Sequence, residues 1–165
     1  MAIGTDPNDV YHKGFFYNRN GNQVTGVSDI TVQSAVAVMS NNQVIFTASG
    51  DVTVHDLLSK CITANGASAT TLQYKIVPTV GSSTTISGVS SSLANAIAGT
   101  LSTFVGDALA TAPIISTSGV GLSQTSRGIF FPAGTLQLAI GTGPTTGTWV
   151  HYIRYSPVSA GATVS

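Results

Sequence analysis

The chain has 165 residues, of which 42% are hydrophobic and only 7% are charged, and its formal net charge is zero. Ordinary soluble domains carry about 25% charged residues, so the surface of this one must consist mainly of small neutral side chains. A balanced charge argues against nucleic-acid binding, and no apolar run reaches the roughly 18 residues that a membrane-spanning helix needs. We therefore expect one domain whose surface is largely covered by other protein chains.

Neither the N-terminus nor the cysteine content predicts export. Residues 1–7 read Met-Ala-Ile-Gly-Thr-Asp-Pro and contain neither the basic start nor the apolar core of a signal peptide. Cys61 is the only cysteine, which excludes a disulfide within the chain and is consistent with synthesis in a reducing cytoplasm. We expect Cys61 to be a small buried apolar residue.

The first 22 residues differ from the rest of the chain, because they are polar and rich in turn-forming residues. They also contain four aromatic residues, Tyr11, Phe15, Phe16 and Tyr17. Aromatic side chains contribute a large share of the energy of protein interfaces, so we expect this arm to be bound rather than free. Two placements are open, over its own domain or over a neighbouring subunit, and the four aromatic residues are the candidate anchors in either case.

From residue 28 onward apolar and polar side chains alternate, which is typical of half-buried β-strands. Four strands are predicted in the first half of the chain, at residues 28–38, 43–48, 52–62 and 69–77. The first two should pair as a hairpin across a turn at Asn41 and Asn42. Residues 56–60 have a helical turn as an alternative, and Pro78 ends the fourth strand because it cannot donate to a ladder.

The middle of the chain is rich in Ser, Thr and Gly and gives weaker signals. We predict loops at residues 81–92 and 111–126, a helical turn at 93–98, and short strands at 100–105 and 129–131. The helical turn is predicted because Leu93 and Ile97 are four residues apart and would share one helical face.

The strongest pattern is a predicted hairpin from Thr135 to Tyr155, joined by the Gly/Pro/Thr-rich residues 141–147. Each strand alternates with period 2. Leu136, Leu138 and Ile140 share one face of the first strand. In the second strand, one face carries Trp149, His151, Ile153 and Tyr155 and the other carries Val150, Tyr152 and Arg154. Because the only Trp lies here, we expect this segment to supply much of the core.

About eight short strands separated by turn residues, with almost no helix, predict an all-β fold. We expect a single-domain antiparallel β-sandwich or jelly-roll-like barrel. The predicted organisation is an extended N-terminal arm at 1–22, the β-sandwich domain at 23–158, and a small, polar, flexible C-terminal tail at 159–165.

No catalytic or metal-binding pattern is recognisable. The three histidines lack metal-ligand spacing, and we expect His151 to be a hydrogen-bonded packing residue. His55 and Asp56 are adjacent, but neighbours on a strand point to opposite faces. The six Asp are scattered, so they predict no carboxylate pair for glycoside hydrolysis. We therefore predict no enzymatic activity, no metal or other cofactor, and no small-molecule substrate.

The C-terminal third resembles a known group of proteins. The run Phe131-Pro-Ala-Gly-Thr-Leu-Gln-Leu138 is followed by Thr146-Gly-Thr-Trp149, by Tyr152-Ile-Arg-Tyr-Ser-Pro157 and by Gly161-Ala162. Together with residues 49–52 and the strand at 72–79, these runs resemble the head decoration, or cement, proteins of tailed bacteriophages. The resemblance covers about residues 44–160.

The resemblance implies an all-β homotrimer on the outer surface of a phage head, with the major capsid protein as its partner. The aromatic arm would bind the capsid or a neighbouring subunit, and we place the trimer contacts along the strand that carries Trp149, Tyr152 and Arg154. Arg154 could instead stack on an aromatic ring or remain solvated. The main alternative is a receptor-binding or tail-fibre module, although no shaft-like repeat is present, and the enzymatic alternative is an esterase or lyase acting on surface sugars.

Overall fold

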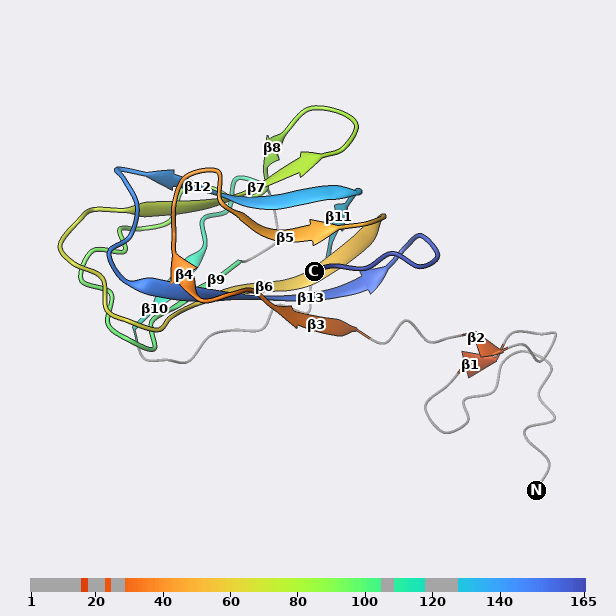
Figure 1. The fold of residues 1–165 in the computed structure, drawn as a ribbon, viewed down its shortest axis with the longest axis horizontal. Coiled ribbons are helices and arrows are strands. Elements are labelled where there is room, and N and C mark those ends of the chain that lie inside the picture. The colour runs from red at the N-terminus through yellow and green to blue at the C-terminus, as the bar shows by residue number, and fades with distance from the viewer. Residues whose placement is uncertain (1–15, 18–22, 25–28, 105–108, 118–127) are drawn as a thin grey trace, which may run out of the picture.

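The computed structural model describes residues 16–17, 23–24, 29–104, 109–117 and 128–165. Every regular element within these residues is a β-strand, and the strands form two large sheets and one two-stranded ribbon (Figure 1). All of the paired strands are antiparallel. The all-β prediction is therefore confirmed. The described residues contain no helix that is long and apolar enough to cross a membrane.

The larger sheet is built around two ten-residue strands, which pair with each other along their whole length. Its strand order is β10 (Ile114–Ser116), β9 (Leu101–Thr103), β6 (Val52–Cys61), β13 (Thr148–Pro157) and β3 (Ile30–Gln33), with β11 (Ile129–Phe131) also paired to β6 and β4 (Ala37–Val38) also paired to β13.

The smaller sheet has four strands in the order β5 (Val44–Ala48), β12 (Gly134–Gly141), β7 (Thr71–Pro78) and β8 (Thr84–Thr85). The remaining two strands, β1 (Phe16–Tyr17) and β2 (Gln23–Val24), pair only with each other. Both strands of this ribbon come from the N-terminal part of the chain.

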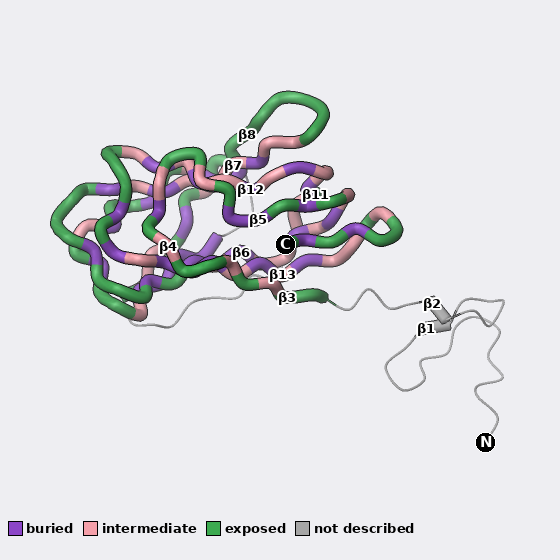
Figure 2. The backbone as a smooth tube through the Cα atoms, viewed as in Figure 1, coloured by how far each residue is buried: buried purple, intermediate pink, exposed green. Residues whose placement is uncertain are grey.

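The two large sheets lie in separate layers with the hydrophobic core between them, an arrangement consistent with a β-sandwich (Figures 1 and 2). Alternate residues of the long strands are buried, as the period-2 patterns predict. Trp149, His151, Ile153 and Tyr155 are all buried on one face of β13. The predicted alternation of this strand is therefore confirmed, except that Val150 on the opposite face is buried as well.

The predicted hairpin between residues 135 and 155 is wrong. Its two halves are β12 and β13, and they belong to different sheets. The same correction applies to the predicted pairing of 28–38 with 43–48, because β3 and β4 pair with β13 whereas β5 pairs with β12. In both cases the apolar faces meet across the core instead of lying side by side. Alternation specifies which face is buried, but not which strand is the hydrogen-bonded neighbour.

The helical turn predicted at residues 93–98 is also wrong, whereas residues 56–60 form the predicted strand and not the alternative helical turn. Residues 56–60 are extended within β6, where β13 and β9 pair with them on either side. Residues 93–98 form successive tight turns, in which Ala96 N–H donates to Leu93 O at 3.2 Å and Thr100 N–H donates to Ile97 O at 3.0 Å. Leu93 is buried and Ile97 is exposed, so these two side chains do not share the buried face that the helical spacing implied. The predicted loop at 111–126 contains a strand, β10.

The C-terminal residues 159–165 are packed against the domain, which corrects the prediction of a flexible tail. Ala162 and Val164 are buried, and Val164 forms an isolated bridge with Ala48 of β5. Val164 N–H also donates to the hydroxyl of Tyr155 at 3.1 Å. Ala162 and Val164 thus attach the segment to the domain, while its other residues are exposed or half-buried.

Candidate interaction surface

The predicted anchors of the N-terminal arm are only partly described. Tyr11 and Phe15 lie outside the described residues. Phe16 and Tyr17 form β1, whose backbone pairs with Val24 and Gln23 of β2. The contacts of these aromatic residues with a partner therefore stay a prediction. For Phe16 and Tyr17, the structure adds that the backbone is a β-strand.

Trp149 is not available to a partner. Its side chain is completely buried in the core of its own domain, and its indole Nε1–H donates to Asn65 Oδ1 at 3.3 Å. The prediction that Trp149 lies in a subunit interface is therefore corrected, because a side chain without exposed surface has nothing to offer a second chain.

Tyr152 and Arg154 do lie on the outer face of the larger sheet. Both residues are half-buried and alternate with the buried residues of β13. Tyr152 lies between Leu58 of β6 and Gln33 of β3 in the ladder. Its position leaves the ring accessible from outside the domain, as a contact residue requires.

Arg154 is held by two carboxylates. Its Nε donates to Asp56 Oδ2 at 2.6 Å, its Nη2 contacts the same oxygen, and its Nη1 contacts Asp29 Oδ2. The hydrogen bond to Asp56 is the main cause that raises the pKa of Arg154 above its usual value, and the negative charge of Asp29 adds to it. A guanidinium paired with carboxylates of its own domain is not among the three states considered for Arg154, which were a subunit contact, stacking on an aromatic ring and full solvation.

Two further side chains extend this group. Ser156 Oγ donates to Asp29 Oδ1 at 2.9 Å, and His55 Nε2 lies 2.6 Å from Ser156 Oγ. We call Asp29, His55, Asp56, Arg154 and Ser156 the Arg154 cluster. It joins β6 and β13 to residue 29, so it holds the chain where the N-terminal part meets the larger sheet.

The Arg154 cluster also corrects the expectation that His55 and Asp56 point to opposite faces. The ladder between β6 and β13 pairs Asp56 with Arg154 but Val54 with Tyr155, so His55 is an extra residue in β6. Such a β-bulge places two successive side chains on the same side of a strand. Both residues consequently reach the cluster.

Replacing Arg154 with methionine should lower the free energy of unfolding by about 1–2 kcal/mol, because two neighbouring carboxylates would lose their shared cation. Urea unfolding at pH 7 measures this loss, and 1 M NaCl should reduce it by screening. The control is Lys75→Met, because the ammonium group of Lys75 hydrogen-bonds the neutral side chain of Asn42. The free energy of unfolding of this variant should change by less than about 0.5 kcal/mol. Equal losses in both variants, insensitive to salt, would contradict the role of the cluster.

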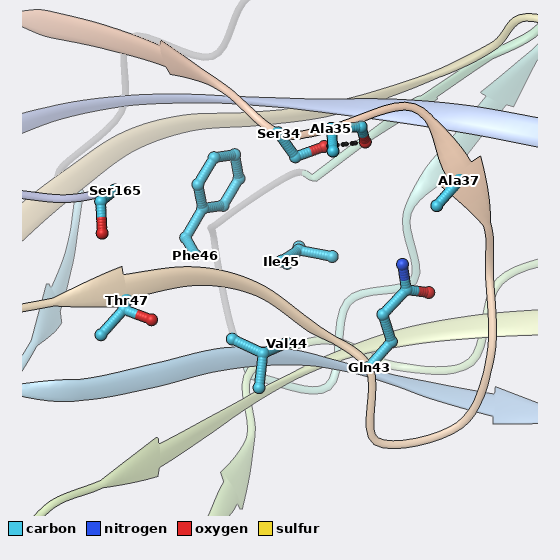
Figure 3. Close-up of a pocket in the computed structure, with 9 residues that line it drawn as sticks. All are labelled: Ser34, Ala35, Ala37, Gln43, Val44, Ile45, Phe46, Thr47 and Ser165. Atoms are coloured by element: carbon cyan, nitrogen blue, oxygen red, sulfur yellow. Dashed lines mark hydrogen bonds between the residues drawn. The ribbon is translucent and has the colours of Figure 1, made fainter.

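A groove lies on another side of the domain, between β5 of the smaller sheet and the β3–β4 segment of the larger one (Figure 3). It has a volume of about 280 Å³. The residues that line it are Ser34, Ala35, Ala37, Gln43, Val44, Ile45, Phe46, Thr47 and Ser165. None of these side chains is charged, so the groove suits a neutral partner.

A polar cluster is buried between the sheets. Ser59 Oγ lies 2.6 Å from His151 Nδ1 and 2.7 Å from the hydroxyl of Tyr74, which comes from the opposite sheet. Burial lowers the pKa of His151 to about 4 and raises the pKa of Tyr74. All three side chains are almost completely buried. The prediction that His151 is a hydrogen-bonded packing residue is confirmed, and the Ser–His contact has no exposed surface at which a substrate could react.

No group of three or more His, Cys, Asp or Glu side chains within the described residues is arranged to hold a metal ion. Comparison of the chain with protein-family models, curated proteins and solved structures gave no significant match. A functional proposal for this protein therefore rests on its own residues and on the sequence resemblance.

Proposed function

We propose that this protein is a structural component of a tailed-phage virion, a decoration or cement protein that binds the outer surface of the head and stabilises contacts between capsomers. It acts as a homotrimer, and its partner is the major capsid protein. This role is structural and needs no catalytic group, cofactor or small-molecule substrate. A jelly-roll connectivity within the two sheets is part of the same proposal.

The observation that carries the proposal is the scarcity of charge on the domain surface. The described residues contain six charged side chains, namely Asp29, Asp51, Asp56, Lys60, Lys75 and Arg154. Three of these six pair with one another in the Arg154 cluster. A surface with so few free charges can be covered by another protein without the large cost of removing ions from water.

Exposed apolar side chains add to this argument. Large hydrophobic residues that are at least two-fifths exposed occur on both sheets and in the loops, and they include Val36, Val38, Val44, Val80, Val89, Ile97, Leu109, Ile114, Phe130 and Val158. A stable contact between proteins buries about 1,200–2,000 Å². A trimer presents each patch three times, so that individually weak contacts combine into tight attachment to a lattice.

The test combines solution mass with binding to heads. Light scattering should give three chain masses of 16.8 kDa, and the protein should sediment with purified phage heads assembled without it. A variant lacking residues 1–22 should bind heads at least tenfold more weakly if the arm is an anchor. A monomer that ignores heads but adheres to host cells would contradict the proposal and favour the receptor-binding module.

A further inference from the structure

The side of the sandwich that carries the groove is bounded by two strand edges. β5 is the end strand of the smaller sheet, while β3 and β4 lie at the end of the larger sheet. Figure 3 shows the groove between these edges, with Ile45 and Phe46 of β5 facing Ser34–Ala37. Exposed strand edges accept further strands, because their backbone groups are unpaired on one side.

The chain already adds backbone to this edge of β5. Thr47 N–H donates to Ser165 O at 2.8 Å, Ser165 N–H donates to Thr47 O at 3.0 Å, and Ser49 N–H donates to Thr163 O at 2.9 Å. These bonds reach no further than Thr47. Within the described residues, no strand pairs with Val44–Phe46 on this side. The first half of β5 therefore offers an edge whose second half already accepts the extended backbone of residues 163–165.

The lining of the groove specifies the kind of strand that fits. It contains no charged side chain, and Val44, which lines it, is 49% exposed. Val36 and Val38, which flank Ala37 on the opposite rim, are also exposed. A charged segment would lose its hydration here without a partner, so the occupant is a short, extended segment without charges.

The β1–β2 ribbon consists of short, extended strands without charges. Its strands are two residues long, contain Phe16, Tyr17, Gln23 and Val24, and carry no charge. A two-stranded ribbon alone is marginally stable in water. Among the residues that the structure describes, the ribbon pairs with no strand of either large sheet of its own chain.

We propose that the β1–β2 ribbon of one copy adds to the Val44–Phe46 edge of β5 in a second copy, at the groove between β5 and the β3–β4 segment. The two features complement each other, since each is a short neutral strand edge without a neighbour. Donor and acceptor are different surfaces, so the contact is heterologous and can close into a ring. Three copies would give the proposed homotrimer. The inference builds on that trimer but does not depend on capsid binding.

Cross-linking tests the contact directly. Cys61 is completely buried, and burial raises the pKa of its thiol, so cysteines introduced at the surface can be oxidised selectively. A Val24→Cys variant and a Val44→Cys variant with different affinity tags are mixed and oxidised. We expect a disulfide-linked dimer that carries both tags. The control pairs Val24→Cys with Val80→Cys and should give at least tenfold less dimer. Val80 lies in the loop after β7, outside the groove, and is 88% exposed.

A second variant tests the edge without cross-linking. Val44→Lys places a charge beside the exposed strand edge, which opposes strand addition. Its mass in light scattering should fall from three chains to one, whereas Val80→Lys should remain trimeric. The inference is overturned if the unsubstituted protein is monomeric, if it is oligomeric without forming the mixed dimer, or if Val24→Cys and Val44→Cys on the same chain link only within that chain.

Failure of this inference can be told apart from failure of the proposed function. A protein that forms the mixed dimer but does not sediment with heads supports the ribbon contact and contradicts the capsid role. A protein that sediments with heads but forms no mixed dimer supports the capsid role and overturns the ribbon contact.

Discussion

Acidification from pH 7 to pH 4 should remove about 3 kcal/mol of folding stability through His151 alone. Its pKa is about 4 in the folded protein, because the imidazole is buried, against 6.5 in an exposed histidine. Between these two values the unfolded chain binds more protons than the folded one, so stability falls as the pH decreases. Each pKa unit corresponds to about 1.4 kcal/mol. The slope from this group should vanish only well above its pKa in the unfolded chain and well below its pKa in the folded protein.

Urea unfolding of the unsubstituted protein and of a His151→Gln variant, at half-unit steps from pH 7.5 to 4, measures this effect. Glutamine keeps a polar group near Ser59 but does not titrate. Subtracting the two pH profiles removes the contribution of the Asp side chains, which are present in both. A difference between the profiles that does not change with pH would show that His151 is not the group responsible.

Replacing Asn65 with alanine should lower the free energy of unfolding by about 3 kcal/mol. Asn65 Oδ1 accepts hydrogen bonds from Gly147 N–H at 3.0 Å and from Trp149 Nε1–H at 3.3 Å. Asn65 Nδ2 donates to Leu93 O at 3.0 Å. All three of these bonds are buried, so alanine would leave the two donors without partners and out of reach of bulk water. Leu93 O would keep only its bond from Ala96 N–H.

Urea unfolding followed by the fluorescence of Trp149, the only tryptophan, measures this loss and reports on the same site. Asn41→Ala is the matched control, because Asn41 is exposed and its side chain accepts one bond, from Ile140 N–H at 3.2 Å. This control should lose less than about 1 kcal/mol. Similar small losses in both variants would mean that the loops around Asn65 rearrange and satisfy the three groups in another way.

The role of Asn65 shows what a local signal can and cannot predict. The Asn-Gly pair at 65–66 favours a turn, which would explain the choice of residue by backbone conformation alone. The structure adds that the Asn65 side chain ties together the loops at residues 93 and 147. At Gly147 a side chain would collide with the carbonyl oxygen of Thr63, so glycine is needed there for close approach. Neither contact is visible in the sequence, because the partners are about 30 and 80 residues away.

The candidate interaction surface also combines features that the local sequence predicts with contacts that only the fold creates. Alternation correctly placed Tyr152 and Arg154 on the face of β13 opposite the core. It could not reveal that Arg154 pairs with Asp29 and Asp56, since these three residues come from distant parts of the chain. Trp149 was chosen as an interface residue for its size, but a large aromatic side chain serves a core as well as it serves an interface.

By itself, the sequence determined that this protein is all-β, which faces of its long strands are buried, and that its surface carries little charge. These properties follow from side-chain chemistry and a period of two residues, both of which are local. Only the tertiary structure decided which strands pair, because antiparallel strands with apolar faces can meet side by side or across a core with nearly equal local preference. The chain crosses from the larger to the smaller sheet after β4, and β5 then pairs only with β12 among the described strands. This pairing leaves β5 at the edge of its sheet, where it borders the groove.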